Sequence, residues 1–146
     1  MNFKLKNLPD RTKRTREFGL TMVMDKGLSL RQAEDLIDSA KEQVDIVKLG
    51  FGTSSFAGNV KEKVKLYKEA NFRVYVGGTL FEAFYVRGQL DDYKKYIDSL
   101  GIDTVEISDG SMSIPHGKKC EIISEFTKNY KVLSEVGSKE EGILIS

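Results

Sequence analysis

The sequence predicts an α/β fold of the (β/α)8 barrel type, with about five βα units present and the barrel incomplete. Strand-like runs alternate with amphipathic stretches, and the runs are marked by Val23, Val47, Val74, Val105 and Val132. Their separations of 24, 27, 31 and 27 residues are typical of successive βα units. Charge recurs on one face of these runs, whereas central strands of an open parallel sheet are apolar on both faces. A doubly wound sheet of five parallel strands is the alternative, because a whole barrel needs roughly 250 residues.

The first two units each combine a strand with a capped helix. Residues 20–25 predict a strand that a Lys-Gly pair ends. Ser29 and Gln32 fit a capping box, and apolar residues at helical spacing continue that helix for about four turns. A strand at 45–50 then precedes a loop rich in Gly, Ser and Thr and a second amphipathic helix that Asn59 caps.

The third unit begins with a strand at 72–76, which a Gly-Gly pair closes. Thr79 and Glu82 fit another capping box, so Glu82 is predicted to cap a helix and not to bind a ligand. Gly88 interrupts this helical stretch, which resumes and stops at Gly101.

The fourth and fifth strands are predicted at 103–108 and 130–136, on either side of a helix that Pro115 opens. Alternation puts Glu106 on the opposite face of the fourth strand from its Val and Ile neighbours. A carboxylate on a buried face needs a cation, a metal or several hydrogen bonds, so Glu106 is either paired structurally or used chemically.

Composition indicates one soluble domain over residues 1–146, with 40% hydrophobic residues and a net charge of +1. That charge balance argues against a nucleic-acid or membrane partner. The basic stretch at 2–18 is predicted to be a solvated arm in preference to an anion-binding one. The single cysteine, Cys120, excludes an internal disulfide and is expected to fill buried space. Without an apolar run long enough to cross a bilayer or act as a signal peptide, the expected location is the cytoplasm.

Charged residues are predicted to gather where the strands end. Alternation places Asp25, Lys48, Glu106 and Glu135 on the face away from the helices, and Lys139 lies just beyond the fifth strand. Three carboxylates and two ammonium groups suit a divalent cation such as Mg²⁺ and an anionic substrate. The alternative is a structural ion-pair network, for example between Lys48 and Glu106.

Two glycine-containing loops are further candidates for substrate binding. Gly77, Gly78 and Thr79, and the Gly-Phe-Gly-Thr run at 50–53, are each able to present backbone N–H groups to a phosphate at a helix start. Ordinary turn chemistry explains either loop equally well. His116, the only histidine, lies at a predicted helix start and is expected to have a surface or capping role.

Taken together, five motifs resemble the phosphosulfolactate synthase family, over about residues 11–139. The motifs, which occur in the order and spacing of that family, are Gly-Leu-Thr with Asp-Lys-Gly-Leu at 19–28, Val-Lys-Leu-Gly-Phe-Gly-Thr-Ser at 47–54, Gly-Gly-Thr-Leu-Phe-Glu at 77–82, Val-Glu-Ile-Ser-Asp-Gly at 105–110 and Glu-Val-Gly-Ser-Lys at 135–139. No single motif would suffice, but the linked set is highly specific.

This resemblance implies a magnesium-dependent (β/α)8 barrel that adds sulfite to phosphoenolpyruvate, giving phosphosulfolactate, as in the first step toward coenzyme M in methanogens. It implies that Lys139 transfers a proton. Asp25, Glu106 and Glu135, the carboxylates of the predicted charged cluster, are the candidates for the metal shell. Lys48 would contact the anionic substrate. Other relatives are tied to sulfolactate or to stress tolerance, so a non-catalytic stress-related or interaction protein is the alternative.

The chain departs from the family by stopping after five units. We therefore expect weak or no synthase activity from these 146 residues alone. The first and fifth strands would expose unpaired edges, which favours association with another chain or with further copies of itself. Another reaction on a phosphorylated enolate is a third possibility, because a barrel rim tolerates changes of chemistry.

Overall fold

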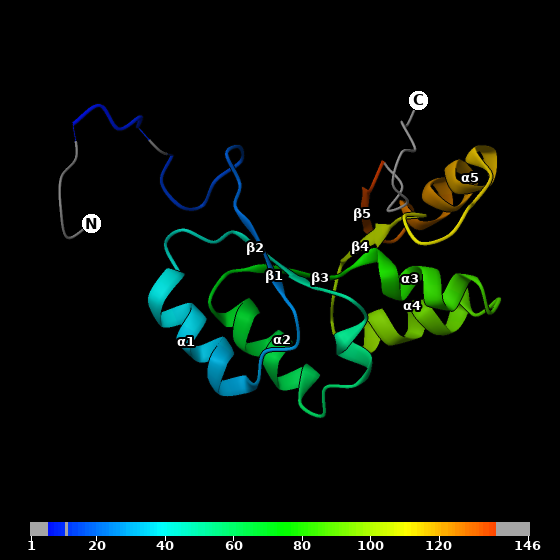
Figure 1. Cartoon of the computed structure of the whole chain (residues 1–146), viewed down its shortest axis with the longest axis horizontal. Coiled ribbons are helices and arrows are strands. Elements are labelled where there is room, and N and C mark those ends of the chain that lie inside the picture. The colour runs from blue at the N-terminus through cyan, green and yellow to red at the C-terminus, as the bar shows by residue number, and fades with distance from the viewer. Residues whose placement is uncertain (1–5, 11, 137–146) are drawn as a thin grey trace.

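The computed structural model describes residues 6–10 and 12–136, and in it parallel strands alternate with helices (Figure 1). The strands are β1 (Met22–Asp25), β2 (Ile46–Leu49), β3 (Arg73–Val76), β4 (Thr104–Ile107) and β5 (Lys131–Ser134). The helices are α1 (Leu30–Ala40), the 3-10 turn η1 (Thr53–Ser55), α2 (Val60–Glu69), α3 (Gly78–Tyr85), α4 (Leu90–Ser99) and α5 (His116–Phe126). Among the described residues, no helix has the length and apolar character needed to span a membrane.

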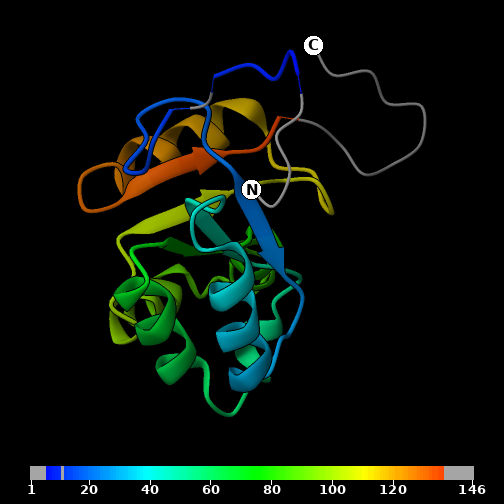
Figure 2. The ribbon, with the colours of Figure 1, turned by 90° about the vertical axis from the view of Figure 1, so that its left-hand side faces the viewer.

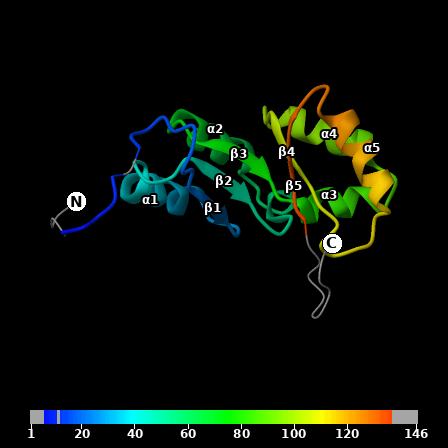
Figure 3. The ribbon, with the colours of Figure 1, turned by 90° about the horizontal axis from the view of Figure 1, so that it is seen from above.

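The strand order confirms the barrel-type prediction over the doubly wound one. All pairings are parallel, and the strands follow one another in the order β1-β2-β3-β4-β5 (Figure 3). A doubly wound sheet would instead reverse its order at a switch point. Right-handed crossovers that always advance in one direction place every helix on the same face of the sheet. Figure 1 shows α1 to α4 beneath the sheet, and Figure 2 shows how steeply β5 is inclined to β1.

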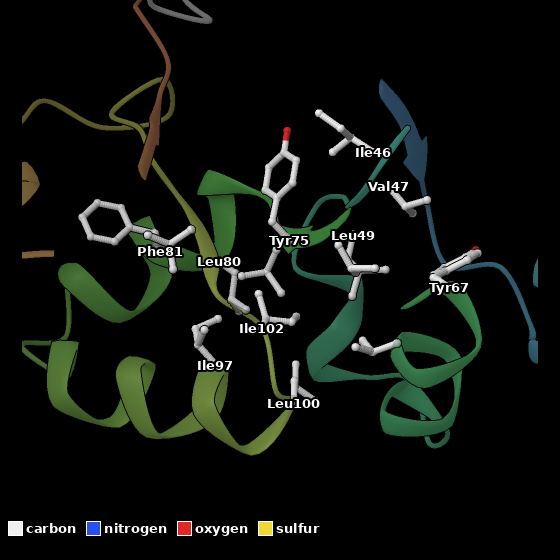
Figure 4. Packing of buried hydrophobic residues seen from close by; sticks show 14 of the residues in the cluster. Ile46, Val47, Leu49, Tyr67, Tyr75, Leu80, Phe81, Ile97, Leu100 and Ile102 are labelled. Carbon is white, nitrogen blue, oxygen red and sulfur yellow. The ribbon is translucent and has the colours of Figure 1, made fainter. Parts of the chain in front are cut away.

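The register assigns each side chain to one of two faces, which we call the helix face and the inner face. Val23, Val47 and Val74 are register partners, as are Val105 and Val132, and these valines point toward the helices. With apolar residues of α1 to α5 they form one core, part of which is shown in Figure 4. The inner face carries the alternate residues, so the ring of Tyr75 points to the side of the sheet away from the helices, where it is also buried.

The inner face is apolar and exposed at both of its margins. Met22 and Met24 on β1 are 45% and 38% exposed, and Leu133 on β5 is 38% exposed. Neither β1 nor β5 has a second neighbouring strand among the described residues. Both margins therefore have the form expected of a barrel that lacks its remaining units.

Two arginines of the basic stretch before β1 are docked onto the helices, so the prediction of a solvated arm is wrong for Arg14 and Arg16, although residues 6–10 and Lys13 are exposed as predicted. The guanidinium group of Arg14 donates to the carbonyl oxygens of Lys41 and Ala70, where α1 and α2 end. Arg16 forms a buried ion pair of 2.6 Å with Asp45. Arginine at a helix carboxyl terminus satisfies unpaired carbonyl groups and the negative end of the helix dipole.

The helix ends confirm some cap predictions and correct another. Ser29 and Gln32 form the predicted capping box of α1. The box predicted for Thr79 and Glu82 is wrong, because α3 begins at Gly78 with Gly77 as its N-cap and without a side-chain cap. Thr79 therefore already lies inside the helix, too late in the chain to cap it.

Other predictions for the helices had mixed outcomes. Asn59 is the N-cap residue of α2, but its side chain makes no cap hydrogen bond. Gly88 separates α3 from α4, as predicted, and adopts a positive φ of 68°. His116 is exposed at the first residue of α5, as expected, whereas Cys120 is exposed and the prediction that it fills buried space is wrong.

Candidate functional site

Three of the predicted charged residues meet at the carboxyl ends of the strands. The Lys48 ammonium lies 2.8 Å from Oε1 of Glu106 and 3.0 Å from Oε1 of Glu135. Lys48 comes from β2, Glu106 from β4, and Glu135 from the residue after β5. Lys48 and Glu106 are buried, whereas the Glu135 side chain is 44% exposed. The cluster is thus a buried Lys48–Glu106 ion pair together with the partly solvent-exposed carboxylate of Glu135.

Lys48 reaches Glu106 by passing over Gly77, the residue that follows β3. A Cβ atom at Gly77 would lie 2.8 Å from Cε of Lys48 and 3.6 Å from its Cγ. With a larger residue at this position the end of the Lys48 side chain would have to shift, because contacts under 3 Å between carbon atoms are repulsive. The glycine therefore leaves room for the lysine side chain on the inner face.

Gly78 leaves room for the Glu106 carboxylate and also donates a hydrogen bond to it. Its backbone N–H donates to Oε1 of Glu106 over 2.6 Å, at the positive amino-terminal end of α3. A Cβ atom at Gly78 would lie 2.9 Å from that oxygen and closer still to Ser108 Oγ. The N–H of Gly77 donates to the carbonyl of Leu49. Both amides of the loop predicted to bind phosphate are thus engaged within the protein, and Thr79 lies in the first turn of α3.

The electrostatics of the cluster keep Lys48 charged. Burial alone would lower the pKa of Lys48, but the adjacent carboxylates of Glu106 and Glu135 outweigh it and the pKa is raised. Tyr75 is the register partner of Lys48, and burial together with the charges of Glu106 and Glu135 raises the pKa of its hydroxyl. At neutral pH the cluster therefore combines a permanent cation with a protonated phenol, and both groups are hydrogen-bond donors.

Asp25 does not join this cluster, so its predicted face is wrong. Its register partner is Leu49, which places it on the helix face. There its carboxylate meets the Lys63 ammonium at 2.8 Å and the Tyr67 hydroxyl at 3.0 Å, both from α2. The N–H groups of the turn after β1 also donate to it, and Asp25 is only 1% exposed. This aspartate is an internal partner that fixes the β1–α1 turn onto α2.

The contact of Glu82 with the loop after β4 was not predicted from the sequence. This carboxylate is buried on α3 and accepts hydrogen bonds from the Ser108 hydroxyl and the N–H groups of Gly110 and Ser111. It therefore holds the loop that follows β4. The available signal was a lone glutamate within the otherwise apolar stretch Leu-Phe-Glu-Ala-Phe.

Lys119 was also missed, although it lies beside the cluster. Its ammonium group donates over 2.7 Å to Asp109 Oδ1 and over 2.7 Å to the carbonyl oxygen of Glu135. It thereby ties the loop after β4 to the end of β5. The sequence signal for it was its spacing, because Lys119 lies three positions before Ile122 and so shares the apolar side of the predicted helix.

The predicted magnesium shell is not assembled by the described residues. Asp25 lies on the other face of the sheet, and Glu106 and Glu135 share the ammonium group of Lys48. Within residues 6–10 and 12–136, no three His, Cys, Asp or Glu side chains are grouped so as to hold a metal ion. Lys139, the predicted proton donor, lies outside the described residues.

Five parallel strands in barrel order, with helices between them and a charged cluster at their carboxyl ends, define the described residues as part of a (β/α)8-type fold. The family model for (2R)-phospho-3-sulfolactate synthase (ComA) matches residues 9–143, and the chain belongs to this family.

Curated relatives named phosphosulfolactate synthase are similar over most of this chain. The protein of Methanothermobacter thermautotrophicus is 38% identical over 135 residues, covering 90% of this chain and 52% of its own length. The Bacillus subtilis protein is 35% identical, with coverages of 91% and 53%. The Methanocaldococcus jannaschii protein is 42% identical, with coverages of 83% and 49%. The chain thus spans about half the length of these relatives.

Proposed function

We propose that this chain forms the amino-terminal part of a phosphosulfolactate synthase, which adds sulfite to phosphoenolpyruvate. The observation that carries the proposal is the Lys48–Glu106–Glu135 cluster, which lies at the carboxyl ends of the strands in a chain of this family. Active sites of (β/α)8 enzymes are built at that end of the barrel. The names of the relatives supply the reaction class.

In the proposed reaction the sulfur of sulfite forms a bond to the methylene carbon of phosphoenolpyruvate. The π-electron pair of the double bond moves toward the substrate carboxylate, and a proton is then added to the adjacent carbon. Lys48 is suited to stabilise the growing negative charge, because its ammonium group is fixed, buried and held in the charged form. Tyr75 is a second donor on the same face. Lys139 is the proposed proton donor, by its place in the family motif.

Magnesium dependence belongs to the proposal for the complete enzyme. The described residues do not provide the ligand set predicted for the ion, and no step above depends on it. A cytoplasmic location also remains a prediction.

The other half of the barrel is the proposed partner of this chain. The remaining βα units would cover the edges of β1 and β5 that no described strand covers, together with the exposed Met22, Met24 and Leu133. The double length of the relatives supports this choice of occupant over a second copy of the chain.

The test measures sulfite-dependent loss of phosphoenolpyruvate in the presence of magnesium. The chain alone is expected to show little activity, whereas co-expression with the carboxyl-terminal half of the Methanocaldococcus jannaschii relative should restore it. Family-like turnover by the chain alone would contradict the need for a partner half. An assembled, folded but inactive complex would contradict the synthase assignment.

A matched substitution separates this enzyme from a non-catalytic protein with the same fold. In the assembled complex, Glu106→Gln should abolish turnover while the halves still co-purify. If Glu106→Gln instead prevents folding or assembly, the cluster is a structural ion-pair network. The short contacts of Lys48 with both glutamates favour that alternative.

A further inference from the structure

The two carboxylates of the cluster already share a cation. Glu106 and Glu135 each direct Oε1 at the Lys48 ammonium, at 2.8 and 3.0 Å. A Mg²⁺ ion bridging the same two oxygens would need both at about 2.0–2.1 Å, in the space between them. The nitrogen atom occupies that space. The metal and the ammonium group would also repel each other as like charges.

The ammonium group is held in place by its two carboxylate partners and by burial of the lysine side chain. Lys48 runs over Gly77, where any side chain would meet its Cε atom, and the side chain is only 9% exposed. The Gly78 N–H fixes the Glu106 oxygen that receives it. Leaving this place would strand Glu106 in a buried position without a cation, which is strongly unfavourable.

We propose that the Lys48 ammonium is the resident cation of the Glu106–Glu135 pair, and that this pair binds no divalent metal ion while Lys48 is present. The inference rests on the site proposed above but not on its reaction, so the two can fail separately. A divalent ion used by the complete enzyme would then be held by groups outside the described residues or by oxygens of the substrate. Lys48 would act on the substrate through charge alone.

The proposal predicts that removing the ammonium group creates a metal site. Mn²⁺ is the probe, and its free concentration is followed by electron paramagnetic resonance as the 146-residue chain is titrated. Lys48→Ala should bind one Mn²⁺ at least about tenfold more tightly than any site of the unaltered chain, because two adjacent carboxylates are released. Adding Glu106→Gln to Lys48→Ala should remove the gained site.

Lys94→Ala is the matched control. Lys94 also bridges two carboxylates, those of Asp91 and Glu125, but on the surface of the molecule. Its removal should leave Mn²⁺ binding unchanged, because mobile, hydrated carboxylates do not form a fixed ligand set. An equal gain in Lys94→Ala would overturn the claim that the cluster geometry matters.

Two further results would overturn the proposal. One is saturable Mn²⁺ binding by the unaltered chain that Glu106→Gln or Glu135→Gln abolishes, since Lys48 would then coexist with the metal. The other is a folded Lys48→Ala chain without a gained site. If Lys48→Ala does not fold on its own, Mn²⁺ should restore its cooperative melting transition, because a ligand of the native state stabilises it. Failure of Mn²⁺ to do so would also count against the proposal.

Discussion

Lys63→Met should destabilise the chain by leaving the Asp25 carboxylate buried without its cation. The pair is enclosed between β1 and α2, at 2.8 Å, with side-chain exposures of 2% and 0%. Breaking a buried pair by removing one partner costs about 3–5 kcal/mol. Asp25 keeps its hydrogen bonds from Tyr67 and from two backbone N–H groups, so we expect about 3 kcal/mol, near the lower limit. In a chain of this size, that loss lowers Tm by about 6–12 °C.

A double-mutant cycle isolates the pair from the methylene groups of the lysine. Urea unfolding is followed by far-ultraviolet circular dichroism for Asp25→Asn, Lys63→Met and the double variant, with a check that the m value is unchanged. The double variant should lose far less stability than the sum of the single losses, with a coupling of about 3 kcal/mol. Additivity within about 0.5 kcal/mol would refute a buried ion pair. Lys65→Met, at an exposed site of α2, is the control and should change stability by less than about 0.5 kcal/mol.

Two more predictions concern acid and the loop after β4. Burial alone would raise the pKa of Asp25, but Lys63 and the backbone donors outweigh it and lower the pKa below the ordinary value of an aspartate. Ionised Asp25 therefore stabilises the fold above its unfolded pKa, and this stabilisation is lost as the pH falls through its folded pKa. In Lys63→Met the free energy of unfolding should depend less on pH in this acid range, as measured by circular dichroism. Glu82→Ala should cost about 2–4 kcal/mol in urea unfolding, because it removes the acceptor for three donors. Amide exchange at Gly110 should accelerate in this variant, and unchanged exchange would contradict the loop-holding role.

Alternation along the strands predicted the cluster where the two faces of a strand differ in polarity. In β2 and β4, Lys48 and Glu106 stand between apolar neighbours, so a period of two assigns them to one face without ambiguity. In β1 the residues before Asp25 are Met-Val-Met, apolar on both faces, and alternation alone had no signal. The pairing of the valines determines the face of Asp25. Val23 pairs with Val47 on the helix face, and Asp25, two residues after Val23, lies on that same face.

Contacts between residues far apart in the chain account for the remaining errors. Thr79 and Glu82 have the spacing of a capping box, and the true partner loop of Glu82 begins 26 residues later at Ser108. Arg14 was assigned to a solvated arm because its carbonyl partners belong to the ends of two helices. Local patterns predict local structure well, but a buried polar side chain is explained only by the element that packs against it.

Two of the buried charge clusters lie on opposite faces of one sheet, and their surroundings separate a structural role from a functional one. Asp25 and Lys63 are sealed between strand and helix, where a substrate has no access. The cluster of Lys48, Glu106 and Glu135 opens toward the inner face through its half-exposed glutamate. An ion pair that a helix covers cannot exchange one of its partners for a substrate unless the helix separates from the sheet. An ion pair at the mouth of an incomplete barrel can instead meet a charged substrate once the remaining strands enclose it, which is why Lys48 and not Asp25 carries the proposed chemistry.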